Sequence, residues 1–222
     1  MKTISTLLIT FLLITVSCTA FAKIYDAYQV NVIIFKRNGA EQLIPDTKTT
    51  PKTFASESQF LSLANDDATN DGSYQLIAQD EFGLLKELTR LKQSKNYTVL
   101  LALSWWQPFQ DQPQGQTLHI YGGQTYNQYG EMVTVIDDED ASYYQINGTI
   151  KISLNTYFDI DTHLQFLVPE KDKSVRVSEN TLTPFKVFEI NEELRSRSNE
   201  LHYLDNPAFG VLIKIAPWDL AT

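Results

Sequence analysis

Residues 146–166, INGTIKISLNTYFDIDTHLQF, alternate between apolar and polar side chains more regularly than any other part of the chain. The large apolar side chains fall on even positions from Ile146 to Phe166, and most polar ones fall on odd positions. A period of two residues predicts a β-strand with one face in the core and the other in solvent. The segment therefore predicts a half-buried, antiparallel-type sheet.

The same segment is too long for one ordinary strand. Its 21 residues, at about 3.3 Å each, would extend for about 70 Å, so the chain must turn back or bend. A three-residue loop preserves which positions face inward, so either 155–157 (Asn-Thr-Tyr) forms such a turn or the strand bends there and continues. Asn155 tolerates a left-handed backbone, which slightly favours the turn.

Three further elements are expected on the N-terminal side. Residues 28–35 predict a strand that starts at a sheet edge and runs into the core. A helix should begin near Asp80, a favoured capping residue, because apolar residues follow it at helical spacing. Residues 98–103 form a continuous apolar run that predicts a strand buried on both faces. The polar stretch 38–79 is expected to be a long surface excursion with one or two helical turns.

The remaining segments complete the predicted fold. Residues 107–145 predict a hairpin with polar loops, and residues 185–188 a short strand followed by an irregular stretch, 189–199. Residues 201–203 and 209–215 predict a hairpin joined by the turn Asp205-Asn206-Pro207. The expected fold class is α+β: a single domain with a mainly antiparallel β-sheet, one main helix and long polar loops.

The N-terminus has the features of a secretory signal peptide. Residues 1–22 contain Lys2, an apolar run and a small-x-small site that ends at Ala22. The run is too short for a transmembrane helix, which needs about 20 residues. We therefore expect an exported protein, residues 23–222, with no transmembrane anchor. Lipoprotein processing at Cys18 is the alternative, although the residues before Cys18 fit that pattern poorly.

Composition limits what the exported chain can do. Without residues 1–22 it has 17 Lys and Arg against 27 Asp and Glu, a formal net charge of −10, and it lacks Cys18, the one cysteine. This balance argues against nucleic-acid binding, which relies on neutralising phosphates. Thiolate chemistry and disulfides are excluded as well. We found no serine-nucleophile motif, P-loop or dinucleotide fingerprint, and we expect no cofactor and no metal.

Two acidic groups of side chains are candidates for chemistry. Asp159, Asp161 and His163 lie at every second position, so a strand would place them on one face. They could bind a metal or act as acid and base, but the favoured interpretation is a solvated strand face. Residues 137–140 (Asp-Asp-Glu-Asp) lack the spacing and glycine of a calcium loop and are best interpreted as a solvated loop.

The aromatic-rich stretch 105–109 (Trp-Trp-Gln-Pro-Phe) suggests a binding surface. If strand alternation persists here, one of Trp105 and Trp106 faces inward and the other outward. An exposed Trp106 beside Gln107 could stack on a sugar ring. The alternative is that both tryptophans close the rim of the sheet.

A polar group near the final hairpin is the second candidate binding site. Arg195, Arg197, His202, Tyr203 and Asp205 could hold a carboxylate or a partner. Local structural bonding is an equally good interpretation of the same residues.

Five segments together resemble one known family. They are YQVNVIIF (28–35), YTVLL (97–101), WQP (106–108), NGTI (147–150) and ELHYLDNPAFGVL (200–212). With these segments in this order, the chain resembles the CsiV family of Gram-negative periplasmic proteins. The last block is the most specific of the five.

The resemblance implies a peptidoglycan-binding protein that supports cell-wall synthesis and catalyses no reaction. It also implies regulation of a bifunctional penicillin-binding protein together with an outer-membrane lipoprotein activator. Two other functions stay open: an envelope interaction module without glycan affinity, and a glycan hydrolase that uses Asp159 and Asp161. For an acidic protein, affinity for the wall must come from directed contacts, because net charge does not supply it.

Overall fold

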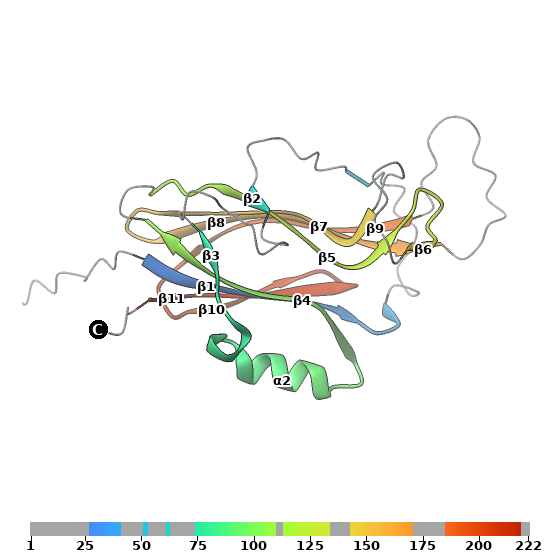
Figure 1. Ribbon diagram of the computed structural model, residues 1–222, viewed down its shortest axis with the longest axis horizontal. Coiled ribbons are helices and arrows are strands. Elements are labelled where there is room, and N and C mark those ends of the chain that lie inside the picture. The colour runs from blue at the N-terminus through green and yellow to red at the C-terminus, as the bar shows by residue number, and fades with distance from the viewer. Residues whose placement is uncertain are drawn as a thin grey trace, which may run out of the picture.

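Two β-sheets face each other across one hydrophobic core, and a helix lies outside one of them (Figure 1). This computed structural model describes residues 27–40, 51–52, 61–62, 74–109, 113–133, 143–170 and 185–218. The described part contains both candidate binding groups predicted from the sequence, the tryptophan pair and the polar group near the final hairpin.

The first sheet, sheet A, has the strand order β10-β11-β1-β4-β3 and is antiparallel throughout. Its strands are β1 (Ala27–Arg37), β3 (Gln75–Leu76), β4 (Tyr97–Pro108), β10 (Leu201–Asp205) and β11 (Phe209–Pro217).

The second sheet, sheet B, has the strand order β2-β5-β7-β8-β9, and β6 pairs with β5. Only the short β2–β5 pair is parallel among the strand pairs of the described residues. The strands of sheet B are β2 (Leu61–Ser62), β5 (Thr117–Tyr126), β6 (Met132–Val133), β7 (Tyr143–Leu154), β8 (Phe158–Pro169) and β9 (Phe185–Ser196).

The alternating segment forms β7 and β8. These strands pair antiparallel from Ile146↔Phe166 to Leu154↔Phe158. Residues 155–157 make the turn between them, and the Asn155 N–H donates to the Tyr157 carbonyl oxygen over 3.0 Å. The three-residue turn is confirmed, and the even-numbered apolar side chains all point into the space between the sheets.

The core lies between the inner faces of the two sheets. Val30, Val32 and Trp105 of sheet A are at most 1% exposed and pack in one cluster with Ile150 and Phe166 of sheet B. Burying side chains of this size stabilises the fold by about 1.5–3 kcal/mol each. The inner faces are therefore structural, and ligand sites must be sought on the outer faces and rims.

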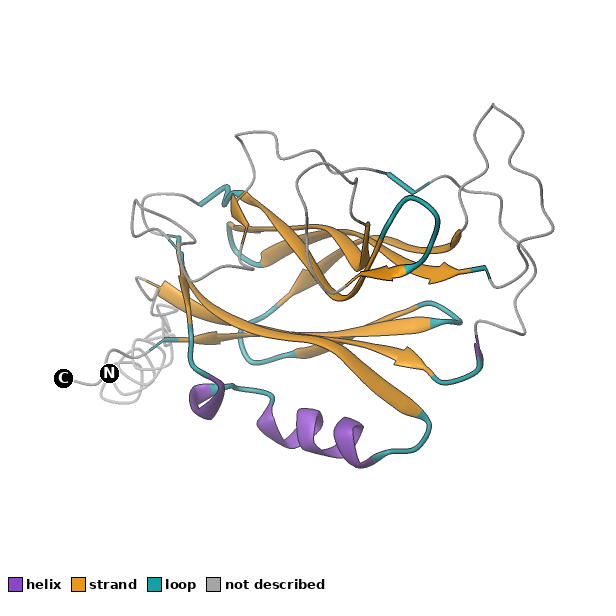
Figure 2. Cartoon of the chain, turned by 45° about the vertical axis from the view of Figure 1, so that its right-hand side comes forward, coloured by secondary structure: helices purple, strands orange, loops and turns teal. Residues whose placement is uncertain are grey.

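The outer face of sheet A is partly covered by α2 (Leu85–Gln93), which Figure 2 shows on the side away from sheet B. Leu88 of the helix packs with Phe82 and Leu84 against Ile33 and Phe35 of β1. The predicted helix start near Asp80 is wrong. Residues Gln79–Glu81 form a separate 3₁₀ turn, and α2 begins only at Leu85, with no side-chain cap on Leu84.

β1 is a central strand, so the prediction that it starts at a sheet edge is wrong. Its polar residues Gln29 and Asn31 are buried beneath the 3₁₀ turn, where they bond to neighbouring groups, except that Asn31 Nδ2 has no hydrogen-bond partner within the described ranges. Gln29 Nε2 donates to the Glu81 carbonyl oxygen and to Ser104 Oγ. Asn31 Oδ1 accepts from the Gly83 N–H at 2.7 Å.

Two strands are longer than predicted. β4 continues past residue 103 to Pro108, and its leucines are only partly buried. The stretch 189–199, predicted to be irregular, mostly belongs to β9, which pairs with β8 up to Ser196↔Phe158. Its exposed residues Glu192 and Glu193 lowered the apolar content there without ending the strand.

The hairpin predictions are confirmed where the structure describes them. β5 and β6 pair antiparallel, as do β10 and β11. At the turn before β11, the Asn206 N–H donates to the Phe209 carbonyl oxygen over 3.0 Å. Of the excursion 38–79, the described parts include the short strands β2 and β3. Within these parts, residue 40 is the one helical position before Gln79. Residues 1–22 and 137–140 lie outside the described ranges.

The fold class is confirmed as α+β, mainly antiparallel with one α-helix in the described ranges. The strands form two facing sheets. No helix within these ranges is both long and apolar enough to cross a membrane.

Candidate functional site

Trp105 and Trp106 point to opposite faces of β4, as strand alternation predicts. Trp105 is fully buried in the core, and its indole Nε1 donates to Gln107 Oε1 over 3.1 Å. Trp106 is half-buried on the outer face of sheet A. Its Nε1 is buried and makes no hydrogen bond within the described part of the chain. Few native donors stay unsatisfied, so Trp106 differs from an ordinary core tryptophan.

Trp106 lines a groove of about 450 Å³ on the outer side of sheet A, which we call the tryptophan groove. The groove is also lined by Trp218, after the end of β11, and by Glu81 of the 3₁₀ turn. Its lining residues are Gln75, Leu76, Ile77, Ala78, Glu81, Trp106 and Trp218. Aromatic rings with a few polar groups are typical of a small-ligand site.

Gln107 points into the molecule and is 1% exposed. Its amide Nε2 donates to the Ile152 carbonyl oxygen of β7 over 3.1 Å, so the side chain joins the two sheets. Both ends of the amide are therefore used internally. We accordingly leave Gln107 out of the proposed site.

Arg195 and Arg197 meet around Tyr157 at one end of sheet B. Their guanidinium carbons lie 5.8 and 5.4 Å from the Tyr157 ring centroid. Arg195 Nε also donates to Asp159 Oδ1 over 2.8 Å, and this hydrogen bond is the main reason that the pKa of Arg195 is raised. The pKa of Arg197 is raised chiefly by its hydrogen bond to Tyr157. The pair forms an exposed cationic corner.

His202 belongs to the contact between β9 and β10. Its Nε2 lies 2.9 Å from Ser196 Oγ and 3.6 Å from Glu200 Oε2, and the residue is half-buried. The contact with Ser196 ties β10, the edge strand of sheet A, to β9, the edge strand of sheet B. The role that these contacts support for His202 is structural.

Tyr203 and Asp205 form a third group, with Arg37 of β1, on the outer face of sheet A. The Arg37 guanidinium donates to both side chains, and the Tyr203 hydroxyl donates to Asp205 Oδ1 over 2.7 Å. The hydrogen bond from Arg37 lowers the pKa of Asp205. Burial, and then the bond to Asp205, raises the pKa of Tyr203 to about 12. The Tyr203 ring stacks on Phe35 but is still 46% exposed.

The structure therefore separates the seven predicted site residues. It brings Arg195 and Arg197 together around Tyr157, and Tyr203 and Asp205 together around Arg37. Trp106 lies in a groove of its own. Gln107 lies in the core, and His202 lies at the contact between β9 and β10.

The outer face of sheet B is a further candidate surface, which the sequence did not predict as a ligand site. Its side chains form rows across β7, β8 and β9, including Ser153↔Asp159↔Arg195, Lys151↔Asp161↔Glu193 and Thr149↔His163↔Asn191. Two grooves of about 530 and 330 Å³ lie along these rows and share Lys151 and Asp161. We call the two together the charged channel.

The charged channel has a wall at one end. The Lys52 N–H donates to Gln165 Oε1 over 2.9 Å, so this segment lies against the outer face of sheet B. Gln165 Nε2 donates in turn to Glu189 Oε1 over 2.7 Å, and Lys52 Nζ lies 3.4 Å from the same oxygen. The polar lining residues of the channel are Lys52, Thr117, Thr149, Lys151, Ser153, Asp159, Asp161, His163, Gln165, Glu189, Asn191, Glu193 and Arg195.

Asp159, Asp161 and His163 lie on this face, as predicted for the polar side of a strand. Asp159 pairs with Arg195, and Asp161 Oδ1 lies 2.9 Å from His163 Nε2. A glycosidase needs two carboxyl groups flanking the scissile bond, one of them kept protonated by its surroundings. An open face with Arg195 bonded to Asp159 does not provide that environment. Among the described residues, no three His, Cys, Asp or Glu side chains could hold a metal ion.

Other residues of these surfaces were not identified from the sequence. Arg37 and Trp218 lie far along the chain from the groups that they join, and only strand pairing brings them close. Tyr121 and Tyr144 sit side by side on sheet B with ring centroids 4.4 Å apart. In β5, His119 and Tyr121 alternate with the buried Leu118 and Ile120, which was the available signal.

The comparisons with known proteins give one family. Neither the curated proteins nor the solved structures gave a match. The family model described as "Peptidoglycan-binding protein, CsiV" matches residues 5–218, which is nearly the whole chain. The match covers β1 with its partner strands, the tryptophan groove and the charged channel together. The chain belongs to the CsiV family of peptidoglycan-binding proteins.

Proposed function

We propose that this protein binds peptidoglycan in the periplasm through the tryptophan groove and thereby supports cell-wall synthesis. The observation that carries the proposal is the family match over residues 5–218. Within the proposal, the leader 1–22 is removed on export, and the protein catalyses no reaction. The match supports peptidoglycan binding, and the outer faces of the two sheets offer candidate surfaces for it.

The tryptophan groove has the chemistry of a sugar site. Trp106 and Trp218 supply aromatic faces on which the apolar side of a sugar ring can stack, and Glu81 and Gln75 supply groups for its hydroxyls and acetamido groups. Trp106 also has an indole N–H without a partner in the described ranges. A glycan oxygen that reaches this N–H after a small side-chain adjustment would satisfy it.

The second part of the proposal concerns partners. We propose that the protein regulates a bifunctional penicillin-binding protein together with an outer-membrane lipoprotein activator. The exposed side chains of Tyr203 and Leu201 on β10, beside the ion pair of Arg37 and Asp205, have the aromatic and arginine composition of protein contacts. Arg195 and Arg197 offer a second such corner.

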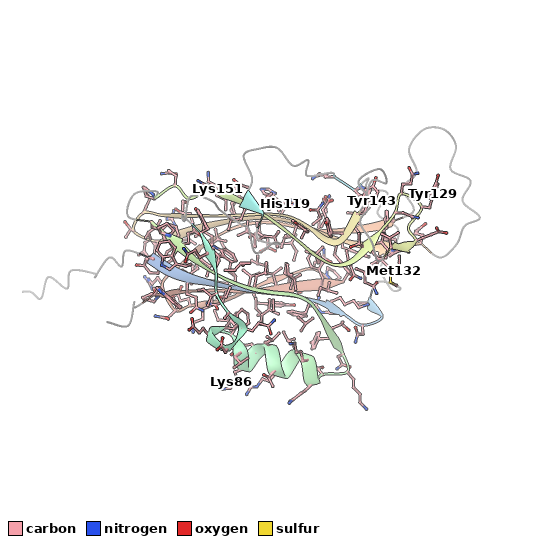
Figure 3. The ribbon with its side chains drawn as sticks, in the orientation of Figure 1. Lys86, His119, Tyr129, Met132, Tyr143 and Lys151 are labelled. Carbon is pink, nitrogen blue, oxygen red and sulfur yellow. The ribbon has the colours of Figure 1, made fainter. Side chains whose placement is uncertain are left out.

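The test of wall binding is co-sedimentation of the purified protein, residues 23–222, with isolated sacculi at moderate salt. We expect the wild type to pellet and Trp106→Ala to remain largely in the supernatant. Tyr129→Ala is the matched control, because Tyr129 is an aromatic residue, 68% exposed, at the far end of sheet B (Figure 3). It should pellet like the wild type.

The same assay separates the alternatives. If the wild type stays in the supernatant, wall binding is wrong, and an interaction module without glycan affinity is the better description. If soluble fragments accumulate and Asp161→Asn abolishes them, the protein is a hydrolase. If Trp106→Ala and Tyr129→Ala both pellet like the wild type, the tryptophan groove is not the site.

A further inference from the structure

Opposite charges without partners lie together in the charged channel. Lys151 projects from β7 into both grooves of the channel, and Glu193 projects from β9 into the larger one. Neither side chain makes an ion pair or hydrogen bond within the described ranges. The other charges of the channel are mostly paired, as Asp159 is with Arg195. Lys151 and Glu193 are thus available to a ligand.

The spacing of these two groups is set by the sheet. Lys151 and Glu193 both pair with Asp161, from opposite sides of β8. Neighbouring strands are about 4.8 Å apart, so the two backbones are separated by about 10 Å. A ligand that lies across β8 can therefore present a carboxylate to Lys151 and an ammonium group to Glu193 at the same time.

The channel is poorly suited to sugar rings. Of its lining residues, His163 alone carries a ring, and its two nitrogens lie 2.9 Å from Asp161 Oδ1 and 3.2 Å from Asn191 Oδ1. Sugars are usually held by flat aromatic faces, and the tryptophan groove supplies these on the other sheet. A channel lined by both signs of charge instead complements a short, charged peptide.

Peptidoglycan contains both kinds of chemistry. Its glycan strands are built of N-acetylated sugars, and its short stem peptides carry carboxylates and, where a diamino acid is present, a free ammonium group. We propose that the charged channel binds the stem peptide, with a carboxylate at Lys151 and the ammonium group at Glu193. This inference rests on the proposed wall-binding function and adds a second site to it.

The experiment uses two soluble probes and the protein without its leader. The first is the tripeptide L-alanyl-γ-D-glutamyl-meso-diaminopimelate, and the second is a tetramer of N-acetylglucosamine, which has no peptide. Titration calorimetry should detect binding of the tripeptide, weakened by salt because the contacts are ionic and partly exposed. Lys151→Gln and Glu193→Gln should each weaken it about tenfold or more, as expected when a charged hydrogen bond is lost.

Two matched controls are available. Glu192→Gln removes the neighbouring charge on β9, but residue 192 is the partner of the buried Thr162 and so points to the other face of the strand. Lys86→Gln removes an exposed lysine from α2, which lies on the opposite side of the molecule from Lys151 (Figure 3). Both controls should bind the tripeptide like the wild type, and neither charge change should affect the sugar probe.

The outcomes separate this inference from the wall-binding proposal. If sacculi pellet the protein but the tripeptide does not bind, or if all four variants bind it equally, the stem-peptide site is wrong and wall binding stands. Sacculi stripped of stem peptides by an amidase give a second readout: Lys151→Gln should lower binding to intact sacculi and leave binding to stripped glycan unchanged. If sacculi fail to bind while the tripeptide binds in the predicted order of variants, the channel is supported and the wall-binding proposal is not.

Discussion

The amide of Gln107 in β4 donates a hydrogen bond to the carbonyl oxygen of Ile152 in β7, 3.1 Å away on the opposite sheet. The same amide accepts from the indole of Trp105. Because Gln107 is almost fully buried, both bonds form away from water, where an unsatisfied group is costly. This side chain connects the two layers directly behind Trp106.

Replacement of Gln107 by leucine should therefore destabilise the protein by about 3 kcal/mol, because it leaves the Trp105 N–H and the Ile152 carbonyl without partners. Urea unfolding monitored by fluorescence measures the change, provided that the slope with denaturant is unchanged. Gln93→Leu, at an exposed position in the last turn of α2, is the control and should have little effect. A loss below about 0.5 kcal/mol for Gln107→Leu would show that the cross-sheet bond adds little.

Asn31 should be a second sensitive polar position. Its Oδ1 accepts from the Gly83 N–H and from Ser104 Oγ, and the residue is fully buried. Asn31→Leu should cost about 2–3 kcal/mol and release the turn that precedes α2. Hydrogen exchange of the Gly83 amide should accelerate more than that of amides in β8. Ser104→Ala, which leaves the bond to Gly83 in place, should have the smaller effect; equal effects would contradict this account.

Gly148 should not tolerate a side chain. A Cβ there would lie 2.0 Å from the His163 carbonyl oxygen and 2.7 Å from the Leu164 Cα, both in the backbone of β8. Gly148→Ala should thus separate the central pair of sheet B and cost about 3 kcal/mol. Thermal unfolding measures this loss. Ser153→Ala, on the outer face of the same strand, should leave the melting temperature nearly unchanged, and a similarly mild Gly148→Ala would refute the predicted clash.

Tyr203 should ionise unusually late. Burial and the bond to Asp205 raise its pKa to about 12, from an ordinary value of 10.0. Because the folded state holds this proton more tightly than the unfolded state, the resulting stabilisation is complete below pH 10 and is lost between pH 10 and about 12. Absorbance at alkaline pH, compared between wild type and Tyr203→Phe, isolates this group.

Asp205→Asn tests the cause of that shift. Removing the carboxylate that accepts from the Tyr203 hydroxyl should lower the pKa of Tyr203 towards its ordinary value. Asp80→Asn, in the 3₁₀ turn, is the control and should leave the titration unchanged. A Tyr203 that titrates near 10.0 in the wild type would contradict the observed environment of the hydroxyl.

Local sequence patterns predicted the elements whose two faces differ sharply. The alternation around Ile150 and Ile160 predicted β7, β8 and the turn between them, because burial on one face imposes a period of two. The final hairpin was predicted from the Asn206-Pro207 turn. β9 was missed beyond residue 188, because Glu192 lies on its inner face near the rim and remains exposed, which breaks the pattern.

The sites were less predictable, because they depend on contacts between distant strands. Strand alternation correctly predicted that one tryptophan of the pair faces outward, but Trp218 reaches the outward Trp106 only through the pairing of β1 with β11. Gln107 was misjudged because alternation places it inward beside Trp105, and only the second sheet provides its acceptor. Lys151 and Glu193 lie on the same face only because β8 pairs with both of their strands, β7 and β9.

The tryptophan groove and the charged channel open on opposite outer faces, with the full thickness of two sheets between them. If both proposed sites are correct, one short stretch of polymer cannot fill both at once, and their occupants would come from separate strands of peptidoglycan. A protein with both sites occupied would cross-link two neighbouring peptidoglycan strands. Its affinity for intact peptidoglycan would then exceed its affinity for soluble fragments, because the second site binds at a high effective concentration. This affinity would depend on the spacing between neighbouring strands.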